Sequence, residues 1–115
     1  MNVQITQHEH CDVVKMAGRV DSYTSQNLEE ALDGLIEKQR TNIVFDMIEV
    51  DFLSSKGIHT LLETQKKCRQ NNGKLVLAGA NDRILELFKL IVLDGYFETF
   101  DDLTAAVGSF ETKSS

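Results

Sequence analysis

Two adjacent serines are the residues of this chain whose types and spacing best suit chemistry. Ser54 and Ser55 follow an apolar stretch that begins at Val50, and they precede a segment with helical periodicity. A serine hydroxyl at a helix N-terminus can accept a hydrogen bond from a first-turn N–H and so cap the helix. The same hydroxyl can be phosphorylated, because free N–H groups and the helix dipole stabilise an added phosphate. The residue types alone leave both interpretations open.

A phosphate at this junction would change the local charge. It adds about −1.5 to −2 charges at pH 7, close in sequence to Asp51, and we expect Asp21 and Asp46 to join that patch in space. The added charge would repel a partner docked there. Lys56 offers an alternative, since it could pair with the phosphoserine or meet an acidic partner.

No second group of residues has the pattern of a catalytic or metal site. His8 and His10 share one strand face without a residue placed to complete a metal site, so a solvated strand end is the prediction. No nucleophile, base and orienting group occur together, and we predict neither an enzyme nor a cofactor. Cys11 and Cys68 lack metal-ligand spacing and are interpreted as buried apolar residues in a reducing compartment.

Hydrophobic periodicity predicts the elements that position the serines. Alternating apolar residues predict a hairpin around residues 3–5 and 14–16, ended by Gly18. A helix follows with Thr24 and Ser25 as its cap, and then a strand over residues 43–45 that ends at Asp46. The remaining predicted elements are a helix from Ser54 or Ser55 to residue 70, a strand over 75–78, a helix over 84–91, a strand over 97–100 and a helix over 101–107.

This order predicts an α/β fold, because strands that alternate with helices form parallel crossover units. We expect one domain over residues 1–110, with a mixed, mostly parallel sheet of about five strands and about four helices packed on it. Residues 111–115 are expected to form a flexible C-terminal tail. Functional groups collect in such folds where strands end and helices begin, and residues 46–57 are one of these corners.

Length and charge narrow the class of protein. The 115 residues suit one domain, and a net charge of −6 opposes binding to nucleic acid. Apolar stretches are too short to cross a bilayer, and the polar start lacks the regions of a signal peptide. We therefore expect a cytoplasmic protein with no membrane insertion and no direct nucleic-acid partner.

The chain resembles the STAS family of anti-sigma factor antagonists over most of its length. Residues 18–24 resemble the family's lead into the first helix, and residues 42–47 resemble its buried strand. Residues 50–58 resemble its signature of aspartate, phosphorylatable serine, glycine and aliphatic residue. Two later stretches, residues 73–79 and 90–94, also fit the family pattern.

The resemblance implies a non-enzymatic partner switch. The unphosphorylated domain would bind a serine kinase of the histidine-kinase-like ATPase type that doubles as an anti-sigma factor. Phosphorylation of Ser55 by that kinase would reverse binding, and a metal-dependent serine/threonine phosphatase would restore it. The residues expected to contact the partner are Asp21, Ser22, Tyr23, Ser54, Lys56, Gly57, Ile58 and His59.

Two positions depart from the family pattern and keep alternatives open. Ser54 stands where the family usually has aspartate, and Lys56 stands where it usually has serine or threonine. Ser54 is therefore a second candidate acceptor. The main alternative function is a constitutive STAS scaffold or an accessory subunit of a transporter or signalling assembly.

Overall fold

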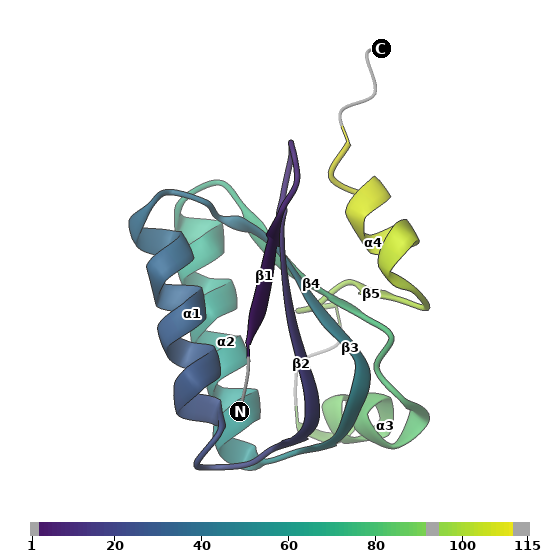
Figure 1. Cartoon of the computed structure of the whole chain (residues 1–115). Helices are drawn as coiled ribbons and strands as arrows, with labels where there is room; N and C mark the ends of the chain where they lie inside the picture. Colours follow the sequence, from purple (N-terminus) through teal and green to yellow (C-terminus); the bar gives the residue numbers. More distant parts are fainter. Residues whose placement is uncertain (1–2, 92–94, 112–115) are drawn as a thin grey trace.

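The computed structural model, which describes residues 3–91 and 95–111, contains one five-stranded sheet with helices on both faces (Figure 1). The strand order is β1-β2-β3-β4-β5, in which β1 is antiparallel to β2 and all other pairs are parallel. The predicted mixed, mostly parallel α/β sheet is thus confirmed. The elements are β1 (Gln4–Gln7), β2 (Asp12–Val20), α1 (Ser25–Glu37), β3 (Asn42–Leu53), α2 (Ser55–Gln70), β4 (Lys74–Ala78), α3 (Asp82–Ile91), β5 (Thr99–Phe100) and α4 (Leu103–Gly108).

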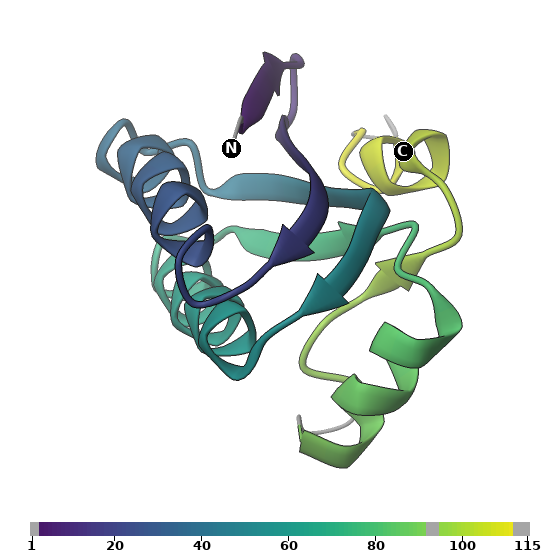
Figure 2. The ribbon, with the colours of Figure 1, turned by 60° about the horizontal axis from the view of Figure 1, so that its bottom comes forward.

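Two helices cover one face of the sheet and a short helix covers the other. Figure 2 shows α1 and α2 side by side on one face, with α4 across the sheet from them. Leu32 of α1 and Leu61 of α2 are fully buried with Phe45 of β3. On the opposite face Val44 packs with Ala106 of α4. Alternate residues of β3 therefore enter different cores, which explains the continuously apolar run at its start.

The prediction that the third strand ends at Asp46 is wrong. β3 continues to Leu53, and Asp46 lies within it at 4% exposure. Pairing with β4 stops at Asp46, and the register with β2 shifts just beyond it, so the strand bends through a bulge. The Asp46 carboxylate accepts a hydrogen bond from the Ile48 N–H at 3.2 Å and so braces this bend. Asp46 is buried in the sheet and does not join the surface patch around the serines.

The prediction that Gly18 ends the preceding strand is also wrong. β2 runs on to Val20, while Gly18 has a φ of 83° and the register shifts between Gly18 and Arg19. Glycine adopts this left-handed conformation without the steric penalty of a Cβ. The glycine therefore marks an irregularity inside the strand, which still reaches the corner where the serines lie.

Smaller differences occur at the element ends. Thr24 stands at the start of α1 but makes no side-chain cap hydrogen bond, whereas Asp102 caps α4 through the Ala105 N–H at 2.8 Å. The predicted last strand shortens to β5. Of the predicted tail only Glu111 is among the described residues, and its N–H donates to the Gly108 carbonyl.

Both cysteines are buried, as predicted, and neither forms a disulfide. Burial raises the pKa of the Cys68 thiol to about 11. Such a thiol stays protonated near neutral pH, so it is a poor nucleophile and acts as an apolar packing residue.

Candidate functional site

The turn from β3 into α2 is built around the side chain of Ser54. Ser54 has an extended backbone, with φ of −79° and ψ of 167°, and its hydroxyl oxygen accepts a hydrogen bond from the Gly57 N–H at 3.1 Å. Its own N–H donates to the Val20 carbonyl at 2.9 Å. The first hydroxyl of the pair is therefore the N-cap of α2, and it also ties the helix start to the end of β2.

Gly57 lies where α2 approaches the end of β2 most closely. A Cβ at this position would lie 2.7 Å from Leu53 Cδ1 and 3.1 Å from Val20 Cγ1. Real Cβ atoms do not tolerate a contact as short as the first, so this glycine lets the helix start pack against the sheet. Ile58 follows it into the core at 2% exposure. Gly57 and Ile58 were predicted to contact the partner, but both are buried in the corner and are not on its surface.

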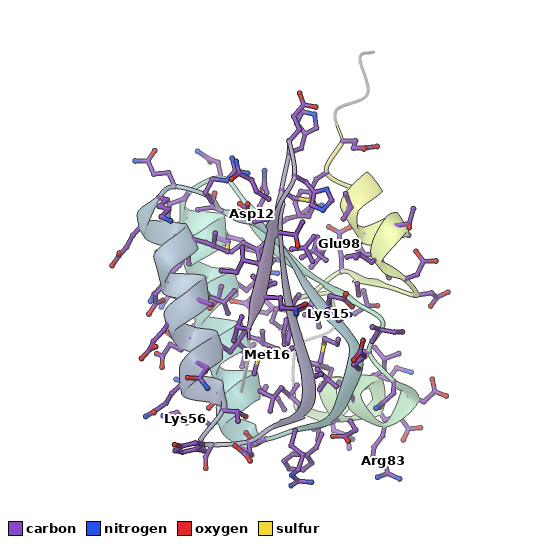
Figure 3. All side chains as sticks on the ribbon, viewed as in Figure 1. Asp12, Lys15, Met16, Lys56, Arg83 and Glu98 are labelled. Carbon is purple, nitrogen blue, oxygen red and sulfur yellow. The ribbon has the colours of Figure 1, made fainter. Side chains whose placement is uncertain are left out.

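Ser55 is the first residue of α2, and its side chain is exposed. Lys56 and His59 are exposed on the same first turn and the next one. Figure 3 shows Lys56 at the end of the molecule where α2 begins, with Asp12 toward the opposite end. The Ser55 hydroxyl is thus accessible at a helix N-terminus, beside one cation and without a cap role.

The loop between β2 and α1 forms the second part of the corner. Asp21 Oδ1 accepts hydrogen bonds from the N–H groups of Tyr23 at 3.0 Å and Thr24 at 2.9 Å. The Thr24 N–H, with further help from the Thr24 hydroxyl, the Tyr23 N–H and Arg19, holds the pKa of Asp21 below its ordinary value. Asp21 therefore shapes this loop as an ionised carboxylate. Ser22 is exposed, and Tyr23 is 80% exposed.

The two parts of the corner are held together through Val20. Its carbonyl accepts the Ser54 N–H, and Asp21 follows it directly in the chain. The structure thus places the Asp21 loop beside the start of α2. The exposed or half-exposed predicted residues on this surface are Asp21, Ser22, Tyr23, Ser54, Ser55, Lys56 and His59. We call this set the switch surface.

Arg19 and Phe52 also belong to this corner, although the sequence did not single them out. The Arg19 guanidinium lies 4.0 Å from the centroid of the Phe52 ring, a cation–π contact that links the ends of β2 and β3. The sequence predicted that this strand ends at Asp46, six residues before Phe52, and for this reason the contact was not predicted.

The switch surface presents the exposed Ser55 hydroxyl at a helix start, with Lys56 next to it. Within residues 3–91 and 95–111 no three His, Cys, Asp or Glu side chains gather as a metal site. None of the helices in these ranges has the length and apolar character needed to cross a bilayer. Among the exposed residues at the start of α2, Lys56 follows Ser55 directly, and His59 lies four residues after Ser55 on the same face of the helix.

Comparison with known proteins agrees with this geometry. Residues 2–106 match the STAS domain family, so the chain belongs to that family, and its relatives place it among the anti-sigma factor antagonists. It is 32% identical over 102 residues to the anti-sigma-B factor antagonist of Listeria monocytogenes, covering 85% of this chain and 89% of that one. It is 30% identical over 90 residues to the anti-sigma-B factor antagonist of Staphylococcus aureus, covering 78% and 83% of the two chains.

A solved structure supports the fold. The phosphorylated form of the Bacillus cell fate determinant SpoIIAA superposes with a TM-score of 0.78 at 14% identity, covering 96% of this chain and all of that one. The relatives named above are regulators by name, not enzymes.

Proposed function

We propose that this protein is a phosphorylation-controlled partner switch of the cytoplasm. Unphosphorylated, it binds a serine kinase of the histidine-kinase-like ATPase type that also serves as an anti-sigma factor. Phosphorylation of Ser55 by that kinase weakens the complex, and a metal-dependent serine/threonine phosphatase restores the binding form. The observation that carries this proposal is the division of roles at the start of α2, where Ser54 caps the helix and Ser55 is exposed.

The cap role of Ser54 favours Ser55 as the acceptor. Phosphorylating Ser54 would turn its cap oxygen into an ester oxygen, a poorer acceptor for the Gly57 N–H, and so would weaken a cap worth about 0.5–2 kcal/mol of helix stability. Ser55 carries no such cost, and a phosphate there would meet the positive end of the helix dipole. The fold therefore accommodates a phosphate on Ser55 more readily than on Ser54.

Charge explains how such a phosphate would release a partner. A docked partner buries the switch surface, where an added charge of about −1.5 to −2 loses its water and faces partner groups placed for a neutral hydroxyl. Like charges brought together in an interface cost several kcal/mol. Lys56 beside the site offsets part of this charge, so we expect weaker binding after phosphorylation rather than none.

The test is binding of the purified kinase to the full chain by isothermal titration calorimetry. The chain phosphorylated on Ser55, and the variant Ser55→Asp, should bind at least about tenfold more weakly than the unmodified protein, which corresponds to about 1.4 kcal/mol. Thr104→Asp is the matched control, because Thr104 is exposed in the first turn of α4, away from the switch surface. Equal binding by wild type, Ser55→Asp and the phosphoprotein would instead favour the constitutive scaffold.

A further inference from the structure

The second half of β3 is open along one edge. β4 pairs with β3 only over Asn42–Asp46, so from Met47 to Leu53 the strand is paired with β2 alone among the described strands. The Asn81 side-chain amide donates to the Val50 carbonyl at 3.4 Å and covers one point of this edge. Figures 1 and 2 both show α3 beside the second half of β3. A strand edge without a strand neighbour can pair with an extended segment of another chain.

An apolar groove lies between this edge and α3. Its volume is about 340 Å³, and its walls are Phe52 and Leu53 of β3 and Ile84, Leu87 and Leu90 of α3. Leu90 is 84% exposed and Phe52 is 37% exposed. Apolar side chains gathered around a groove of this size, rather than scattered singly, are typical of a binding surface.

Charges on the rim define the chemistry of an occupant. Asp51 and Glu86 contribute carboxylates and Arg83 contributes one guanidinium, all three exposed. In the part of the chain that the structure describes, none of the three takes part in an ion pair. The rim therefore has a net negative charge available to an occupant that combines an apolar side chain with a cation.

The groove adjoins the corner between β3 and α2 that carries the switch surface. Leu53 lines the groove and its Cδ1 is also the atom nearest to a Cβ built on Gly57. Phe52 lines the groove while its ring carries the Arg19 guanidinium. At Leu53 the groove lies two residues from Ser55 in the chain, so a partner docked over Ser55 would lie close to it.

We propose that this groove binds an extended, basic segment of the same kinase, with a leucine or methionine side chain between Phe52 and Leu90. This inference rests on the proposed function for the identity of the partner. The groove supplies an interaction that phosphorylation of Ser55 does not touch directly. The groove therefore determines which kinase binds, whereas the phosphorylation state of Ser55 determines when the kinase binds.

The groove can be tested without the kinase by NMR titration of the 15N-labelled full chain. The probe is a short capped peptide with leucine between two lysines, and the comparison peptide has leucine between two aspartates. The lysine peptide should shift the amide signals of residues 51–53 and 83–90, with saturation in the millimolar range typical of short peptides. The aspartate peptide should bind at least about fivefold more weakly, because it would face the rim carboxylates.

Two variants, each of which replaces an exposed apolar residue with serine, complete the test. Leu90→Ser should weaken the lysine peptide at least about fivefold, since the buried leucine contact is lost. Ile5→Ser, which changes an apolar residue 47% exposed on β1 outside the groove, should leave it unchanged. Shifts elsewhere, equal binding of both peptides, no shift at 10 mM peptide, or no effect of Leu90→Ser would overturn the groove proposal. These results do not depend on Ser55, so the two proposals can fail separately.

Discussion

Single residues at the corner have distinct tasks that follow from their chemistry. Ser54 uses its oxygen on the Gly57 N–H, Asp21 uses its carboxylate on the N–H groups of its own loop, and Ser55 keeps its hydroxyl at the surface. The polar groups that shape the corner are thus satisfied within the chain. This arrangement leaves Ser55 free to be modified without dismantling the turn that presents it.

Gly57 is a position where a single methyl group should change the stability of the protein. Gly57→Ala should lower the free energy of unfolding by about 1–3 kcal/mol, because the new methyl group would overlap Leu53 and press on Val20. Urea denaturation measures the change. Gly34→Ala in α1 is the control. A Cβ added at Gly34 would meet nothing within 4 Å, so this variant should raise the free energy of unfolding by about 0.4–1 kcal/mol. A Gly57→Ala protein as stable as wild type would refute the close packing of this corner.

Asp21 predicts a dependence on pH. Its folded-state pKa is lower than its ordinary value, so the ionised carboxylate stabilises the fold above about pH 4 and this contribution is lost as the pH falls further. Asp21→Asn keeps an oxygen acceptor but cannot ionise. Its Tm should be lower than that of wild type at pH 7, and the gap should close as the pH falls below about 4. A gap that stays constant from pH 7 to pH 3 would show that the charge of Asp21 is not involved.

At the scale of elements, the first turn of α2 leaves the positive end of the helix dipole without a negative partner. The helix has no acidic residue there, although Lys67 and Arg69 occupy its last turn. Ser55→Asp should therefore raise the free energy of unfolding by about 0.3–1 kcal/mol, because a carboxylate would meet the positive end of the helix dipole. Chemical denaturation at low salt measures it. Destabilisation would mean that weak kinase binding by this variant reflects a damaged fold rather than a changed surface.

The elements themselves could be predicted where local pattern decides them. The amphipathic face of α2, with Leu61 and Cys68 buried, and the cap at Ser54 were both visible in the sequence and are confirmed. The length of β3 was not, because a buried carboxylate at Asp46 resembles a strand end in a linear pattern. Its neighbour Ile48 supplies the N–H that satisfies it, and that contact depends on a bulge set by pairing with β2.

At the scale of the whole molecule, contacts between distant segments lay beyond sequence reasoning. Arg40, between α1 and β3, donates to both carboxylate oxygens of Asp12 at 2.7 and 3.3 Å, and Asp12 is 2% exposed. Gln65 of α2 similarly exchanges hydrogen bonds with the backbone of Leu75 in β4. Neither pair has a local pattern, because each depends on how the elements pack. The groove beside α3 was missed for the same reason.

The two ends of the sheet carry different groups of residues. The Asp12–Arg40 pair fixes the end where β2 begins, and the switch surface lies at the end where β2 and β3 finish. Free helix N–H groups gather at that second end, as they do in other α/β sheets where strands lead into helices. Under the proposed function, the fold would present Ser55 to a partner at this end, while the core and the opposite end hold the sheet.

Mass spectrometric mapping of phosphate tests directly whether Ser55 is the acceptor. The full chain, Ser54→Ala and Ser55→Ala are each incubated with the purified kinase and ATP, and the modified peptides are sequenced. We predict one phosphate on Ser55 in the wild type and in Ser54→Ala, and none in Ser55→Ala. A phosphate that persists in Ser55→Ala, or one that maps to Ser54 in the wild type, would rule out Ser55 as the acceptor.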